Sequence, residues 1–419
     1  MNRSCITFLA ATLGLVIGLG FCASAHAQST VKIAYIDPLS GPFANVGEQG
    51  LKHFQAMAEE VNAAGGLNGQ KIEIVGFDDK VSPQEALNQL KRAIDENIRF
   101  ITQGNGSAVA GALIEAVNRH NERNPGKEVL YLNYAAVDPA LTNDKCSFWH
   151  FRFDANSDMK MESLTTWMAQ NKAIKKVYLI NQDYSFGHAV RKAAREMLAR
   201  KRPDVQIVGD DLHPLGKVTD FSPYVAKIKQ AGADTVITGN WGQDMALLIK
   251  AAKDAGLSAD FYTYYAGGLG ALPAMGASAI GHVKQITEWH ENVLPSSIEN
   301  WSQDFEKKYK VDFYYLRVRT AMQMLAAAAK KAKSVEPKAV AYALEGMRLE
   351  TPTGEVEMRK QDHQLIQPLY LSTVYKQASK GGPKEVKYDI ENTGLGFKTE
   401  AKLDAARSAR SSSCNMTRP

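Results

Sequence analysis

The feature that most constrains the fold is a repeated alternation of short apolar segments with amphipathic helical segments. The first run extends from residue 31 to residue 132, and a second run begins beyond residue 150. Strands that alternate with helices form parallel sheets with helices on both faces. The predicted strands are 31–36, 71–77, 100–102 and 129–132 in the first run, and 176–180, 205–208, 235–238 and 261–264 in the second. The pattern therefore predicts an α/β protein with two doubly wound lobes.

The order of elements changes beyond residue 285, where helical segments return at 296–309, 313–332 and 336–344. Helices that follow both runs indicate that the chain crosses between the lobes more than once. We therefore expect a multi-crossing hinge. The predicted parts are an N-terminal lobe of 28–150 with 286–345, a C-terminal lobe of 151–285 with 346–397, and a C-terminal tail of 398–419.

Residues 1–27 are typical of a secretory signal and are excluded from the fold. Arg3 supplies the positive start, residues 6–21 are apolar, and Ala25-His26-Ala27 offers the small residues that cleavage requires. The apolar stretch is short for a membrane-spanning helix. An uncleaved anchor is the alternative interpretation. We expect cleavage near Ala27 and export of a soluble protein into an oxidising space.

The cysteines fit such a space. Cys5 and Cys22 leave with the signal, so that Cys146 and Cys414 remain. Two cysteines in an oxidising compartment predict one disulfide, which would tie the tail to the body of the protein. The alternative is two unpaired thiols.

Charge and motifs exclude several classes of function. The chain carries 50 Lys+Arg against 45 Asp+Glu, interleaved along its length, which argues against a nucleic-acid binder. Residues 104–111 come closest to a nucleotide loop but lack the third glycine of a dinucleotide fingerprint and the Lys-Ser/Thr pair of a phosphate loop. Metalloprotease, Cys-x-x-Cys and Gly-x-Ser-x-Gly motifs are also absent from the sequence. We expect no cofactor and no metal, and Ser107 is a candidate nucleophile without an identifiable base.

Loops at the ends of the first-lobe strands are suited to binding. Ligands of open parallel sheets lie beyond the carboxyl ends of the strands, where helix N-termini point their free N–H groups. Gly106 and Ser107 follow the third predicted strand, and Ala135 and Ala136 follow the fourth. Ser107 could cap a helix or donate to a ligand, and the small residues would expose backbone N–H groups to an anion.

The second lobe offers aromatic residues at corresponding positions. Phe186, Trp241, Tyr264 and Tyr265 follow three of its predicted strands. Ligand pockets favour aromatic walls with a few polar groups, whereas any single aromatic residue can equally belong to the core. Trp241, between Asn240 and Gly242, is the strongest candidate.

These features together resemble the periplasmic leucine/isoleucine/valine-binding protein family. The resemblance extends over nearly the whole mature chain. It is carried by the segments 36–41, 65–69, 78–79 and 135–142, together with Gly47, Asp183, Phe186-Gly187 and Asp220-Phe221. The family implies a type I periplasmic binding fold that closes two lobes on a solute about a hinge and delivers it to an ATP-driven importer.

The resemblance implies that Gly106, Ser107, Ala135 and Ala136 hold a ligand carboxylate, and that Phe186, Trp241, Tyr264 and Tyr265 close over it. Three positions depart from the family pattern. Val137 replaces a frequent threonine, Val46 takes the place of a first-lobe aromatic residue, and Tyr265 or Ala266 replaces the acidic residue that receives an ammonium group. A desolvated ammonium without a carboxylate partner costs several kcal/mol. Asp244 could replace that acid, but it more readily starts a helix, where a carboxylate suits the dipole.

The expected function is that of a periplasmic substrate-binding protein of a branched-chain-amino-acid-type ABC importer. Two ligand classes stay open, namely an aliphatic amino acid and a carboxylate or amide that lacks an ammonium and has an aromatic body. The expected partners are this ligand and an inner-membrane ABC permease, with a monomeric chain. The alternative function is a secreted hydrolase of small esters or amides that uses Ser107.

Overall fold

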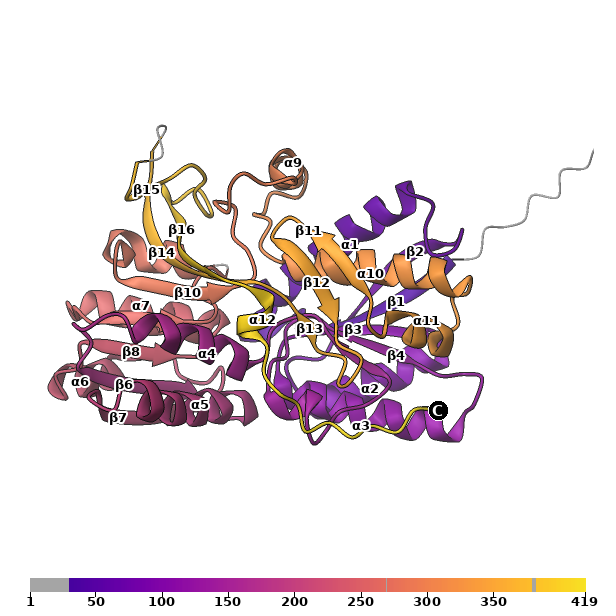
Figure 1. Ribbon diagram of the computed structural model, residues 1–419, viewed down its shortest axis with the longest axis horizontal. Helices are drawn as coiled ribbons and strands as arrows, with labels where there is room; N and C mark the ends of the chain where they lie inside the picture. The colour runs from indigo at the N-terminus through magenta and orange to yellow at the C-terminus, as the bar shows by residue number, and fades with distance from the viewer. Residues whose placement is uncertain (1–29, 269, 379–381) are drawn as a thin grey trace, which may run out of the picture.

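The computed structural model describes residues 30–268, 270–378 and 382–419. The predicted signal and its cleavage point at Ala27 lie outside these residues. None of the helices in the described ranges is long and apolar enough to cross a membrane. Figure 1 shows two lobes side by side, joined by several crossings of the chain.

The first lobe is built on a parallel sheet with the strand order β2-β1-β3-β4-β5 within the described residues. Every residue of β3 and β4 is buried, which is typical of strands covered on both faces. The strands are β1 (Thr30–Asp37), β2 (Lys71–Asp78), β3 (Phe100–Gln103), β4 (Leu130–Asn133) and β5 (His150–Arg152).

Helices from two distant parts of the chain cover this sheet. Ser82 caps α2 by accepting a hydrogen bond from the Glu85 N–H, and Pro83 begins that helix. The helices are α1 (Ala44–Ala63), α2 (Pro83–Asp95) and α3 (Ser107–Arg123) before the first crossing, and α9 (Glu299–Tyr309), α10 (Leu316–Ala332) and α11 (Pro337–Leu344) after the second. Short 3-10 turns, η1 (Gly41–Phe43) and η2 (Pro139–Thr142), accompany them.

The second lobe is built on a larger, mixed sheet. Its path in the described residues is β15-β14-β10-β9-β8-β6-β7, and β16 also pairs with β14. The strands from β6 to β10 are parallel, whereas β14 is antiparallel to both β10 and β16. The strands are β6 (Lys176–Gln182), β7 (Gln206–His213), β8 (Thr235–Thr238), β9 (Asp260–Thr263), β10 (Val283–Thr287), β14 (Leu369–Gln377), β15 (Glu385–Val386) and β16 (Leu395–Leu403).

The second lobe has its own helices on both sides of this sheet (Figure 1). They are α4 (Ser157–Met168), α5 (Ser185–Lys201), α6 (Ser222–Gln230), α7 (Gly242–Asp254) and α8 (Ala271–Met275), with the 3-10 turn η3 (Gly276–Ala279). The prediction of two α/β lobes joined by several crossings of the chain is confirmed.

The crossings lie later in the chain than the sequence predicts. Phe153 belongs to the first core and Ala155 to the second, and the chain returns between Ile286 and Trp289. The predicted third crossing at 345/346 is wrong, because apolar residues up to Leu365 pack in the first core. A small antiparallel sheet of β11 (Arg348–Thr351), β12 (Gly354–Met358) and β13 (Leu365–Ile366) covers that lobe.

Regular structure extends beyond residue 398, where the sequence predicts that the tail begins, because β16 continues to Leu403. Helix α12 (Ala405–Ser408) follows, and the last residues then return to the first lobe, where they run past α3 in Figure 1. Cys414 forms a disulfide with Cys146, and Met416 packs against the first core. The tail is therefore a further connection between the lobes.

Candidate functional site

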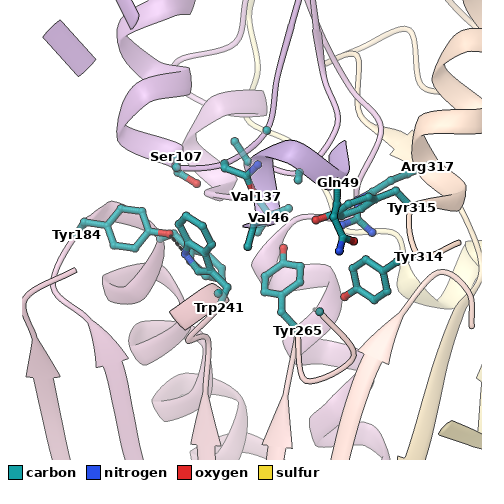
Figure 2. A pocket seen from close by; sticks show the side chains of 18 residues that line it. Val46, Gln49, Ser107, Val137, Tyr184, Trp241, Tyr265, Tyr314, Tyr315 and Arg317 are labelled. Carbon is teal, nitrogen blue, oxygen red and sulfur yellow. Dashed lines mark hydrogen bonds between the residues drawn. The ribbon is translucent and has the colours of Figure 1, made fainter. Parts of the chain in front are cut away.

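A cleft between the two lobes brings the strand-end loops together (Figure 2). It contains about 570 Å³ of space between protein atoms, part of it open to solvent. The described residues that line it are Val46, Gln49, Gly104, Asn105, Gly106, Ser107, Ala135, Ala136, Val137, Tyr184, Phe186, Trp241, Gly242, Tyr265, Gly268, Tyr314, Tyr315 and Arg317.

The first wall segment is the loop between β3 and α3. Gly104 must be glycine because a Cβ there would lie 2.6 Å from the Tyr134 ring, and Gly106 has a φ of 102°. The buried Asp37 carboxylate holds the loop by accepting hydrogen bonds from the Gly104 N–H (3.2 Å) and the Asn105 N–H (2.8 Å). Burial raises the pKa of Asp37, although these hydrogen bonds oppose the shift.

The second wall segment follows β4, and its polar groups are already committed. Asn133 Oδ1 accepts hydrogen bonds from the N–H groups of Ala135 (3.1 Å) and Ala136 (2.8 Å). The prediction that these two N–H groups face an anion freely is therefore wrong, although both residues line the cleft. Ser107 Oγ accepts a hydrogen bond from the Asp138 N–H (3.2 Å), which leaves its own hydroxyl proton for a ligand.

The second lobe supplies an aromatic wall. Trp241 Nε1 donates to the Tyr184 hydroxyl (2.8 Å), and Phe186 packs near Tyr265 with ring centroids 6.2 Å apart. Tyr264 does not line the cleft, so its predicted role is wrong. It is fully buried, its hydroxyl donates to the Ser157 carbonyl (2.8 Å), and its ring centroid lies 6.0 Å from that of Phe186 and 6.3 Å from that of Tyr265.

One aromatic contact joins the two lobes beside the cleft. Phe43 of the first lobe packs on Trp241 with ring centroids 4.3 Å apart. Gly216 and Gly242 make room for it, because a Cβ at either position would lie within 2.7 Å of the Phe43 ring. This contact between the lobes belongs to a closed arrangement.

Four buried charges lie where the lobes join. Arg317 lines the cleft and donates to Glu288 Oε1 (2.6 Å), and its Nε lies 3.6 Å from Asp154 Oδ2. Lys160 Nζ lies 2.9 Å from Asp154 Oδ1 and 4.6 Å from the centroid of the Tyr265 ring. Asp154 lies at the first crossing and Glu288 at the second, so the hinge passes through this network.

The network fixes the charge of its members. Burial alone would lower the pKa of Arg317, but Glu288 and Asp154 raise it above its ordinary value. Burial would raise the pKa of Glu288, but Arg317 and Lys160 lower it. Burial lowers the pKa of Lys160, against the attraction of Asp154. The two cations and two anions therefore balance one another.

The cleft contains no carboxylate among the described residues that line it, and Arg317 is its one charged side chain there. Asp244 is buried at the start of α7, where its Oδ2 accepts from Gln182 Nε2 (2.8 Å) and the Gly216 N–H (2.9 Å). Histidine is likewise absent from the described lining, so Ser107 has no base beside it, and the hydrolase alternative is not supported. No group of three or more potential metal ligands occurs in the described residues.

Sequence reasoning missed the residues that line the cleft from the hinge side. These residues come from α1, from the segment just before α10 and from the first turn of α10, none of which is a strand-end loop; they are Gln49, Tyr314, Tyr315 and Arg317. The sequence does contain an indication of this site, because Tyr314 and Tyr315 precede a predicted helix in which Arg317 lies among apolar residues. Such an arginine needs a buried partner or a ligand.

The whole described architecture matches known proteins. Residues 30–381 match the family model described as periplasmic binding protein. The chain is 36% identical over 416 residues to Leu/Ile/Val-binding protein homolog 4 of Brucella abortus, with 96% of each chain covered. It is 24% identical over 352 residues to the leucine-, isoleucine-, valine-, threonine- and alanine-binding protein of Pseudomonas aeruginosa, covering 80% of this chain and 88% of that protein.

Solved structures agree with this match. The leucine-, isoleucine-, valine-, threonine- and alanine-binding protein of Brucella ovis, in its closed conformation, is 34% identical and superposes with a TM-score of 0.82, covering 93% of this chain and 100% of that chain. A solute-binding protein of an ABC transporter from Rhodopseudomonas palustris, in complex with 3,4-dihydroxybenzoic acid, shares the fold at 20% identity with a TM-score of 0.76, covering 90% and 98%.

Proposed function

The chain belongs to the periplasmic binding protein family and has a solute-binding role, and from that premise we propose that its ligand is a small organic carboxylate without an ammonium group. The ligand has an apolar, preferably aromatic, body. It is captured between the lobes by hinge closure.

The observation that supports this ligand class is the charge of the cleft. The described lining offers Arg317 and no carboxylate, and Lys160 stands behind the Tyr265 ring. A buried ammonium would find no free carboxylate, because Glu288 and Asp154 are already paired with Arg317 and Lys160. Removing it from water would cost several kcal/mol. The carboxylate of the same molecule has no such difficulty.

The ligand carboxylate is assigned to the start of α3. Ser107 is the first residue of this 17-residue helix, whose N-terminus carries a partial positive charge and unpaired N–H groups. The Ser107 hydroxyl proton adds a side-chain donor at the same place. The rings of Trp241, Phe186 and Tyr184 then cover the body of the ligand from the second lobe.

An aliphatic amino acid is the second candidate, because several relatives are named as Leu/Ile/Val-binding proteins. It would have to place its ammonium against neutral acceptors such as the Gln49 amide oxygen or a tyrosine hydroxyl. The two candidates differ in one functional group, which makes them separable with matched compounds.

The remaining parts of the function follow from the family. We infer that the chain is exported to the periplasm, with cleavage of the signal near Ala27, and that it acts as a monomer. An inner-membrane ABC permease receives the solute from the closed form. The hinge crossings at 153–155, 286–289 and 365–369 allow the two lobes to move as units.

A thermal-shift screen of the mature chain tests the proposal, with amino acids, amides, aliphatic acids and aromatic acids as compounds. A ligand at 100 times its Kd stabilises the folded state by about 2.7 kcal/mol. We expect stabilisation by carboxylates that lack an ammonium, and mass spectrometry should recover each hit unchanged. Stabilisation by amino acids alone would overturn the ligand class, and conversion of a hit into product would overturn the binding role.

A further inference from the structure

Polar side chains gather at the end of the cleft nearest the hinge. Figure 2 shows Ser107 on one side of the cleft and Gln49, Tyr314 and Arg317 together on the other. Gln49 comes from α1, Tyr314 from the segment just before α10 and Arg317 from the first turn of α10, and none belongs to the strand-end loops that surround Ser107. The cleft therefore has two polar ends separated by aromatic and aliphatic side chains.

The hinge end has hydrogen-bonding capacity that the protein does not use. The Tyr314 hydroxyl is buried and makes no hydrogen bond to any described residue. Arg317 Nε is also buried without a hydrogen bond and has an ion-pair contact with Asp154 Oδ2 at 3.6 Å. Both groups can donate. Buried donors in folded proteins are nearly always paired, so unpaired donors beside a ligand cleft indicate that a ligand atom or a water accepts from them.

The balance of charge decides what kind of acceptor fits. Arg317 and Lys160 are neutralised by Glu288 and Asp154, and the side chains of all four are at most 1% exposed. A second ligand carboxylate at this end would leave an unbalanced negative charge away from water, and an ammonium would add a third cation. A neutral oxygen avoids both costs.

We propose that Tyr314 and Arg317, with the Gln49 amide beside them, form a second subsite that binds a neutral hydrogen-bond acceptor at the far end of the ligand. The acceptor is a hydroxyl or carbonyl oxygen, and the ligand is a monocarboxylate that carries it opposite its carboxylate. This inference rests on the proposed function, because it takes the carboxylate to lie at Ser107.

Matched compounds test the subsite in the full mature protein. The probes are benzoate, 4-hydroxybenzoate, terephthalate and 4-(aminomethyl)benzoate, together with the 3-phenylpropanoates that carry the same four para groups (hydrogen, hydroxyl, carboxylate and aminomethyl). Within each series the ring and first carboxylate are constant, so calorimetric titration reports the para group alone. We expect the hydroxyl compound to bind at least tenfold more tightly than the unsubstituted, dicarboxylate and ammonium compounds in the series whose length fits.

Two variants assign the effect to residues. Tyr314→Phe removes only a hydroxyl and should reduce the advantage of the hydroxyl compound over the unsubstituted one at least fivefold. Tyr309→Phe removes a hydroxyl on α9 outside the cleft and should leave that ratio unchanged. Circular dichroism and the unfolding midpoint establish that both variants fold.

Glu288→Gln tests the charge argument with a side chain of the same shape. The network then carries one excess positive charge, so the affinity for the dicarboxylate should rise at least tenfold relative to that for the hydroxyl compound. An unchanged ratio would overturn the claim that charge balance selects a neutral group.

The possible failures are distinguishable. If the unsubstituted and hydroxyl compounds bind the wild-type protein equally, or if Tyr314→Phe leaves their ratio intact, the second subsite is refuted while the proposed carboxylate function stands. If no carboxylate of either series binds and amino acids do, the proposed function fails and the subsite fails with it.

Discussion

The two lobes contribute opposite chemistry to one cleft. The strand-end loops of the first lobe present mainly backbone and small side chains, and their polar groups are tied to the lobe itself, as Asp37 holds the Gly104–Asn105 loop and Asn133 holds Ala135 and Ala136. The second-lobe wall consists of aromatic rings, whose polar atoms make hydrogen bonds from Trp241 to Tyr184 and from Tyr265 to Asp154. Internal hydrogen bonds therefore fix the first-lobe loops before a ligand binds, whereas the second lobe supplies the apolar surface that contacts the ligand.

The two lobes therefore contribute to binding in different ways. Internal hydrogen bonds fix the first-lobe loop, so little conformational entropy is lost when it meets a ligand. The aromatic wall buries the body of the ligand, and its Trp241 also meets Phe43 when the lobes close. We therefore expect changes in the second lobe to alter affinity most, and changes in the first lobe to alter orientation and stability.

Trp241→Ala should break the aromatic wall and have the largest effect. Loss of a central aromatic side chain costs about 2–4 kcal/mol of binding free energy, which corresponds to a roughly 30- to 1000-fold rise in Kd. Trp241→Phe keeps a ring against Phe43 and should lose far less. Calorimetric titration with the best carboxylate of the screen measures both, and equal affinity of Trp241→Ala and wild type would remove Trp241 from the site.

Ser107→Ala should weaken binding to an intermediate degree. It removes the donor assigned to the ligand carboxylate, and a hydrogen bond to a charged group contributes about 1.5–3 kcal/mol, or at least tenfold in Kd. Ser82→Ala is the matched control, because it removes a helix-capping serine at the start of α2, outside the cleft. The control should lose about 1 kcal/mol of folding stability with unchanged affinity. A similar Kd for Ser107→Ala and wild type would move the carboxylate elsewhere.

Asp79→Asn should produce the smallest effect, visible only in the pH dependence of stability. Burial, followed by the Asp37 charge, raises the pKa of Asp79 far above its ordinary value. Such a carboxyl group is protonated in the folded state but ionised in the unfolded state, so stability falls as pH rises through the folded pKa, by up to about 1.4 kcal/mol per pH unit for one proton. The variant should therefore lose less stability than wild type between pH 6.5 and pH 8.5 in urea unfolding.

Glu291 provides the comparison for that experiment, because burial raises its pKa to about 8 at the second crossing, away from the first-lobe wall. Glu291→Gln should flatten the same part of the stability profile without affecting the loop that Asp37 holds. If Asp79→Asn has the same pH slope as wild type, Asp79 is ionised in the folded state and the account of the first-lobe wall is wrong in this respect.

Much of the architecture could be predicted because periodicity reports local structure and burial. Ser107 and Trp241 could be singled out because they follow apolar strands, and strand-end loops of parallel sheets meet at one edge. The hinge side could not be found in this way. Arg317 lies in the first turn of a helix whose pattern is typical of the core, and Tyr314 lies just before that helix. Their place in the cleft depends on the second crossing, which no local pattern specifies.

The same limit explains the misplaced boundaries. The segment 348–366 has strand character, but its sequence does not say which of two cores its apolar residues join, and they join the first. Tyr264 and Tyr265 are a similar case, because both rings pack near Phe186 but Tyr265 lines the cleft and Tyr264 does not, and the sequence does not distinguish them. Composition and spacing do not indicate which core or cleft such residues join, because tertiary packing determines it.

The most direct test of the account is calorimetric titration of the mature protein with two compound pairs that differ only in the ammonium group. The pairs are 3-phenylpropanoate with L-phenylalanine and 4-methylpentanoate with L-leucine. A cleft that presents Arg317 and no carboxylate predicts that the compound without the ammonium binds at least tenfold more tightly in whichever pair fits. Tighter binding of the amino acid in either pair would contradict the account.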